Sequence, residues 1–76
     1  MGIRQNFPPA RSRLDKAKRR VQRAEEMIAR QRRAIEHAKA KGLDLSESIK
    51  VLELLVSALE VFQADLDNIT QRVRPH

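Results

Sequence analysis

The distribution of helix-breaking residues limits this chain to very few folds. No proline occurs between Pro9 and Pro75, and the only glycine between them is Gly42. The residues in between are rich in Ala, Leu, Glu, Lys, Arg and Gln, which favour helices. Gly42 can take the left-handed conformation that ends a helix, and Asp44 with Glu47 forms a capping-box pattern for the next one. The sequence therefore predicts an all-α fold, a two-helix antiparallel coiled-coil hairpin.

These signals also set the expected boundaries. We expect a flexible N-terminal arm over residues 1–8, a first helix from about 9 to 41, a turn over 42–44, a second helix from about 45 to 72, and a tail over 74–76. The helical hairpin, 9–73, forms one domain. Its connection is only a few residues long, which favours antiparallel neighbours.

Heptad spacing predicts the seam between the helices. The a and d positions of the first helix are Leu14, Ala17, Val21, Ala24, Ile28, Gln31, Ile35 and Ala38. Those of the second are Ile49, Leu52, Val56, Leu59, Gln63, Leu66, Thr70 and Val73. A fold back at residues 43 and 44 brings each a residue opposite a d residue. Gln31 and Gln63 interrupt the seam, and either fix its register or reach water at a bundle edge.

Charge is divided unequally within the formal net charge of +6. Cations dominate the first helix and acids the second. In an antiparallel pair the e positions face each other, so we expect these charges to pair across the seam. The residues are Arg11, Lys18, Arg32 and Lys39 on the first helix, and Glu53, Glu60 and Asp67 on the second. Each exposed pair contributes at most about 1 kcal/mol, so the charges mainly select orientation and partner.

The second helix carries more apolar surface than one partner helix can cover. A helix that is apolar around most of its circumference is normally buried. The extra residues either widen the intramolecular core or form an oligomer interface, and we favour a homodimeric four-helix bundle. The expected interface residues are Met27, Leu54, Leu55, Ala58, Val61, Phe62 and Ile69.

A basic run in the first helix offers a second function. Its cations could follow a phosphate backbone without reading sequence, and the alternative is a solvated face that also partners the acidic helix. The candidate nucleic-acid contacts are Arg11, Arg13, Lys16, Arg19, Arg20 and Arg23. Two phenylalanines, with no tryptophan or tyrosine, argue against recognition by base stacking.

No catalytic, metal or cofactor-binding residues are predicted. The only histidines, His37 and His76, lack a partner at metal-ligand spacing, and no phosphate-binding loop or nucleophile motif occurs. We therefore expect no cofactor and no small-molecule substrate. The chain has no cysteine, no signal-like amino terminus and no apolar run near 20 residues, which predicts a cytoplasmic protein with no membrane span.

Three segments carry a family resemblance. They are Ile28-Ala29-Arg30-Gln31-Arg32, Gly42-Leu43-Asp44, and the stretch with Leu54-Leu55, Leu59-Glu60 and Phe62-Gln63-Ala64-Asp65-Leu66. Over residues 24–66 the sequence resembles short helical-hairpin proteins of unknown function that are common in alpha-proteobacteria. The resemblance implies the hairpin fold, and it implies no activity, ligand or cofactor.

The sequence thus predicts a non-enzymatic interaction or oligomerisation module, an adaptor or regulatory protein that binds a further copy of itself, with a dimer favoured, or a partner helix. The first alternative is a basic nucleic-acid-associated protein that contacts phosphates through the N-terminal part of the first helix. A third hypothesis, an enzyme with its site between subunits, requires acids and arginines clustered around a pocket.

Overall fold

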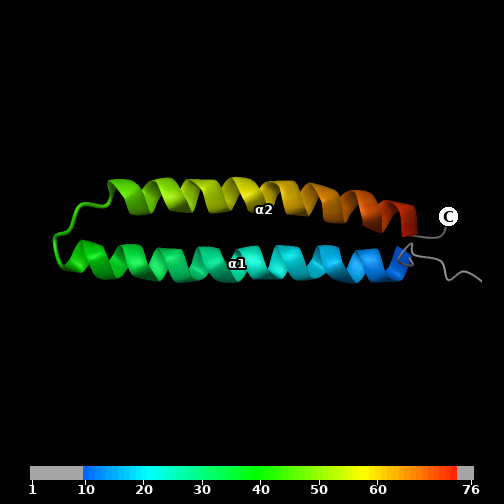
Figure 1. Cartoon of the computed structure of the whole chain (residues 1–76), viewed down its shortest axis with the longest axis horizontal. Helices are drawn as coiled ribbons and strands as arrows, with labels where there is room; N and C mark the ends of the chain where they lie inside the picture. The colour runs from blue at the N-terminus through cyan, green and yellow to red at the C-terminus, as the bar shows by residue number, and fades with distance from the viewer. Residues whose placement is uncertain (1–9, 74–76) are drawn as a thin grey trace, which may run out of the picture.

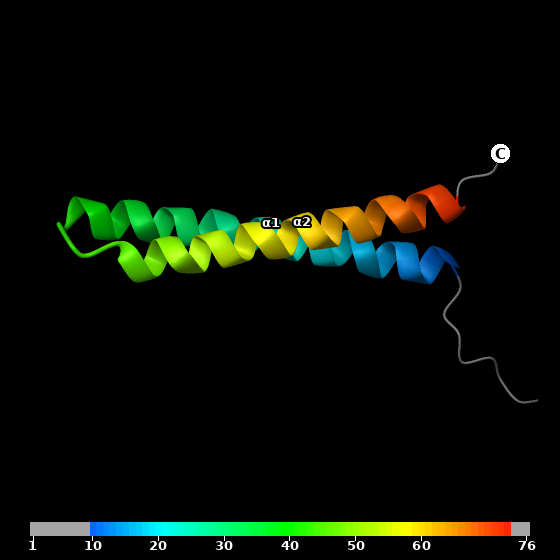
Figure 2. The ribbon, with the colours of Figure 1, turned by 90° about the horizontal axis from the view of Figure 1, so that it is seen from above.

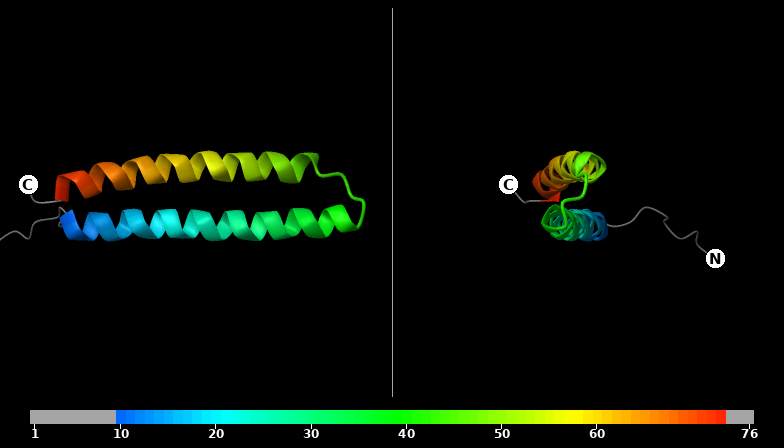
Figure 3. Two further views of the ribbon diagram at one scale, coloured as in Figure 1. Left: turned by 180° about the vertical axis from the view of Figure 1, so that it is seen from behind. Right: turned by 90° about the vertical axis from the view of Figure 1, so that its left-hand side faces the viewer.

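The structure is a computed structural model that describes residues 10–73, with side chains described from residue 12 onward. Its two helices, α1 (Ala10–Ala40) and α2 (Ser46–Val73), run antiparallel and side by side (Figure 1). Seen from above they cross at a shallow angle (Figure 2), and the views from behind and end-on agree (Figure 3). The hairpin has an open end, where α1 begins and α2 stops, and a turn end at residues 41–45.

The predicted all-α hairpin is confirmed, and its helix ends lie close to the expected ones. α1 ends at Ala40 instead of 41, and α2 runs over Ser46–Val73 instead of about 45 to 72. The predicted start at residue 9, the arm over 1–8 and the tail over 74–76 lie outside the described residues.

Gly42 ends α1 as predicted, in a Schellman motif. Its φ is 71°, in the left-handed region that favours glycine. The Leu43 amide donates to the Ala38 carbonyl oxygen at 3.0 Å, and the Gly42 amide donates to the Lys39 carbonyl oxygen at 3.0 Å. These two bonds satisfy carbonyl groups that the end of a helix leaves free.

Asp44 caps α2, but the predicted capping box is incomplete. Its Oδ1 accepts hydrogen bonds from the Ser46 amide at 3.0 Å and from the Ser46 hydroxyl at 2.8 Å. These bonds, the backbone bond first, stabilise the carboxylate and hold the pKa of Asp44 below its ordinary value. The reciprocal bond of a capping box, in which the Glu47 carboxylate would accept from the Asp44 amide, is not made in the described part of the chain, and the Ser46 hydroxyl adds a second bond to the Asp44 carboxylate instead.

The predicted seam of α1 is confirmed. Ala17, Ala24 and Ile28 are buried, at 2%, 4% and 7% exposure, and the other a and d side chains of α1 are half-buried. Two of the three buried residues are alanines, because a small side chain on a closely packed helix is readily covered by its neighbours. The core therefore lies along α1.

The seam of α2 keeps the predicted d residues Leu52, Leu59 and Leu66 but differs in part at the a positions, because the helix is rotated about its axis. Its large half-buried side chains recur at d and at g, and two predicted a residues, Val56 and Thr70, are half-buried as well. The d and g residues are Leu52, Leu55, Leu59, Phe62, Leu66 and Ile69. Of the predicted a positions, Ile49 is 43% exposed and Gln63 is exposed. The rotation turns six large apolar side chains toward the alanines of α1, which buries more apolar surface than a seam that includes Gln63.

Gln31 and Gln63 have different roles. The Gln31 amide donates from Nε2 to the Ser48 carbonyl oxygen at 2.9 Å, so it ties α1 to the first turn of α2. Gln63 faces water. The structure thus supports a register role for Gln31, whereas Gln63 lies outside the seam.

Candidate functional site

The largest exposed apolar side chains lie mostly on one side of the hairpin. Leu54 is 71% exposed, Val61 65%, Val51 43% and Met27 42%. No residue of α2 is buried. On α2 these residues occupy c and f positions, so they follow one another at helical spacing and form a continuous stripe.

Met27 of α1 lies on the same side as this stripe. At the open end, a groove between the helices is lined by Arg13, a g residue of α1, and by Asp65, a c residue of α2. Steps of seven residues along each helix stay on one face, so Met27 and Ala34 follow Arg13, while Ala58 and Val51 precede Asp65. We call the set Met27, Ala34, Val51, Leu54, Ala58 and Val61 the apolar strip.

Only part of the predicted interface belongs to this strip. Met27, Leu54 and Val61 are exposed, and Ala58 is half-buried beside them. Leu55, Phe62 and Ile69 are half-buried at g positions and belong to the seam with α1. For these three residues the intramolecular explanation applies, although none of them is fully enclosed. Ala34 and Val51 were not among the expected interface residues, and their heptad relation to Met27 and Ala58 is the signal that identifies them.

The predicted cations are gathered at the open-end half of α1. Lys16, Arg19, Arg20 and Arg23 are exposed and line one shallow surface depression. Glu26 joins Arg19 and Arg23 in a second depression one turn further on. The Arg11 side chain lies outside the described residues. The structure therefore brings a compact cationic surface together from a single helix.

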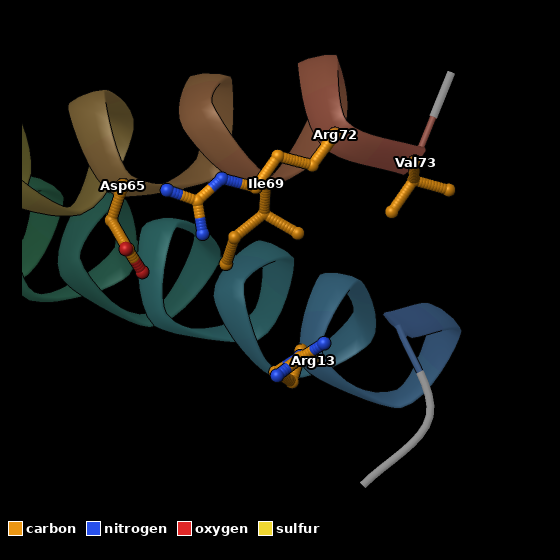
Figure 4. A pocket seen from close by; sticks show the side chains of 5 residues that line it. All are labelled: Arg13, Asp65, Ile69, Arg72 and Val73. Carbon is orange, nitrogen blue, oxygen red and sulfur yellow. The ribbon is translucent and has the colours of Figure 1, made fainter. Parts of the chain in front are cut away.

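The open-end groove combines cations with an apolar floor. Figure 4 shows Asp65 and Ile69 reaching from α2 toward α1, while the Arg72 side chain runs back along α2 toward Asp65. Arg13, Lys16 and Arg20 line the groove from α1. Asp65 is the one carboxylate among these lining residues, so the groove is cationic overall. The sequence prediction did not include Asp65 or Arg72 here.

The opposite side of the hairpin has a different groove. Ile28, Val56 and Leu59 form its apolar part, and Glu25, Ala29 and Arg32 of α1 flank it. Because α2 is rotated, Val56 occupies the position beside Glu25 and Arg32 where acids were expected. The prediction of facing e-position charges is therefore wrong. The acids concerned, Glu53, Glu60 and Asp67, are exposed on the outer side of α2.

Within residues 10–73, no three potential metal ligands of the His, Cys, Asp or Glu type come together. Neither α1 nor α2 has the apolar character needed to cross a membrane. Comparison with protein-family models, curated proteins and solved structures gives no match. The resemblance to alpha-proteobacterial hairpin proteins remains a prediction.

Proposed function

We propose that this chain is a non-enzymatic interaction module, a helical hairpin that pairs with a second copy through the apolar strip to form a four-helix bundle. In this role it acts as an adaptor or regulatory protein. The observation that carries the proposal is the state of α2, which has no buried residue while Leu54 and Val61 are 71% and 65% exposed.

The free energy of apolar burial favours a second copy that covers the apolar strip. Full burial of a valine, leucine or methionine side chain contributes roughly 1.5 to 3 kcal/mol. A contiguous exposed apolar surface often marks an interaction site, whereas single exposed apolar residues are common on any protein. Because the chain is short, the single seam between its two helices forms only a small core. In proteins of this size, oligomerisation commonly provides the additional stability.

Sedimentation of the wild type and of a matched pair of variants tests this function. The wild type should dimerise with rising concentration, and Leu54→Glu should raise the dimer dissociation constant at least about tenfold, because a charge replaces a leucine that dimerisation would bury. Ser57→Glu adds the same charge one turn away, at an exposed position of α2 outside the strip, and should leave the dimer intact.

A wild type that stays monomeric at high micromolar concentration contradicts the proposal. Equal weakening by both substitutions contradicts the assignment of the interface to the strip. Circular dichroism of both variants confirms that the hairpin itself is folded.

The exposed cations support a second candidate function, binding of nucleic acid through its phosphates. Lys16, Arg19, Arg20 and Arg23 share one face of α1, a geometry suited to a phosphate backbone. Duplex DNA should be retarded at low salt, with affinity that falls steeply as salt rises. Replacing Arg19, Arg20 and Arg23 by alanine should abolish retardation.

A control for this test is available on the same helix. Arg32 and Lys39 are exposed at e positions, on the other side of α1. Replacing both by alanine should weaken binding much less than the Arg19, Arg20 and Arg23 substitutions. Absence of retardation for the wild type at low salt, with DNA or RNA, would rule out this function.

A further inference from the structure

We propose that the two hairpins of the dimer lie parallel, with both open ends at one end of the bundle, and that each α1 packs against the partner's α2. This inference rests on the proposed function, and it specifies the orientation of the second copy on the apolar strip. The charges that border the strip on each helix distinguish the possible orientations.

Two symmetric arrangements bring one apolar strip against another. In closed two-fold dimers the same patch of each copy meets its counterpart. A two-fold axis across the helices reverses one hairpin, so α1 packs on the partner's α1 and α2 on the partner's α2. A two-fold axis along the helices keeps both hairpins in one direction, and α1 then packs on the partner's α2.

The borders of the strip carry opposite charges on the two helices. On α1 its g and c positions hold cations, namely Arg13, Lys16, Arg20, Arg23 and Arg30, and Lys41 follows directly after the helix. On α2 its c and f positions hold Glu47 and Asp65, with Arg72 at the open end. The arrangement with the axis across the helices, called crosswise here, would place the cationic border of α1 against the same border of the second copy. Like charges facing each other across an interface disfavour association.

The parallel arrangement brings complementary charges to the same level at Asp65 and Glu47, whereas at the open end Arg72 comes level with Arg13. Within one hairpin, Arg20 and Asp65 line the same groove, so they lie at one height along the long axis. A two-fold axis along that direction preserves height, so Arg20 of one copy comes level with Asp65 of the other. At the turn end, Glu47 of α2 likewise comes level with the cationic end of the partner's α1.

Apolar packing favours the same arrangement. The strip has Met27 and Ala34 on α1 and its larger share on α2. In the parallel dimer, these α1 residues meet Val51, Leu54 and Ala58 of the second copy, which lie at matching heights. In the crosswise dimer, α2 would pack on α2, and Arg30, which lies midway between Met27 and Ala34 on α1, would face Arg30 of the second copy.

The absence of cysteine from the chain allows a direct test by disulfide formation between single-cysteine variants. Ala34→Cys and Leu54→Cys lie at exposed positions on different helices, so their thiols are accessible. A mixture of the two variants should form the mixed disulfide, identified by mass, and Leu54→Cys alone should form little dimer. Val51→Cys, one helical turn away, replaces Leu54→Cys if that variant fails to associate.

The result that would overturn the inference is efficient disulfide formation by Leu54→Cys alone with none between Ala34→Cys and Leu54→Cys. Such a result leaves the proposed function intact, because the wild type would still dimerise. A monomeric wild type in sedimentation overturns both, so the two failures are distinguishable.

A charge variant gives a second readout of orientation. Asp65→Asn should weaken the dimer about two- to tenfold, since a carboxylate facing the partner's cations is lost in each copy. Asp67→Asn makes the same change two residues away, on the outer side of α2, and should have no effect. Equal effects, or a tighter dimer with Asp65→Asn, contradict the parallel arrangement.

Discussion

α1 and α2 face each other across one seam but contribute different residues to it. The three buried residues among the side chains described over 12–73, Ala17, Ala24 and Ile28, all belong to α1, although α1 carries most of the charge. α2 contributes large side chains and buries none of them fully. Large side chains project past the edge of a single partner helix, whereas small ones are covered by it. The more apolar helix is therefore the less buried one.

The strongest test of this difference is one substitution placed on each helix. Ala24→Glu puts a charge at a position that is 4% exposed, so it should cost on the order of 3 kcal/mol and unfold the hairpin. Ala64→Glu, at an exposed position of α2, should change stability by less than about 0.5 kcal/mol. Thermal unfolding followed by circular dichroism measures both, and equal melting temperatures would remove the contrast.

Substitution of one glutamine on each helix should give effects of intermediate size on the free energy of unfolding, and these again compare α1 with α2. Gln31→Ala removes the bond from Nε2 to the Ser48 carbonyl oxygen and should cost about 1 kcal/mol. Gln63→Ala removes an exposed side chain and should be nearly neutral. Urea unfolding gives the free energies. A larger loss from Gln63→Ala would mean that α2 uses the predicted a and d seam after all.

The smallest expected effect concerns the start of α2 and depends on pH. Hydrogen bonds from Ser46 hold the pKa of Asp44 below its ordinary value in the folded chain. Their stabilisation is complete above the ordinary aspartate pKa of about 3.9 and is lost as pH falls through the lowered pKa. Other carboxylates titrate there too, so the comparison is with Asp44→Asn, which keeps a capping side chain that does not titrate.

On acidification, the melting temperature of the wild type should fall a few degrees further than that of Asp44→Asn. The Ser46 amide resonance should report the same titration in the wild type only. Identical acid profiles for the two proteins would show that the Asp44 carboxylate contributes nothing to the cap.

Sequence reasoning was most accurate where apolar residues are sparse. In α1 the pattern from Leu14 to Ala38 fits a single heptad phase, and that phase is confirmed. In α2 apolar residues fill several faces, so periodicity alone admits more than one phase. Side-chain size decides between them, because Leu55, Phe62 and Ile69 fill the space beside the alanines of α1 better than Ile49 and Gln63 do.

The candidate site was predicted only in part for the same reason. Leu54 and Val61 were identified as surplus apolar residues, but without the rotation of α2 they could not be separated from Leu55 and Phe62. The rotation also moves Glu53 and Glu60 outward and brings Asp65 to the cationic groove. A rotation of α2 by one heptad position changes which residues face α1, and the periodicity of a single sequence does not determine that rotation.

The hairpin topology has a mechanical consequence for anything attached to it. α1 has 31 residues, so the turn stands about 46 Å from the end at which both helices have their outer termini. A segment attached at either terminus would therefore hold the hairpin at its open end. At the turn end, Leu43 is 57% exposed beside Gly42, and the length of α1 sets its distance from the open end.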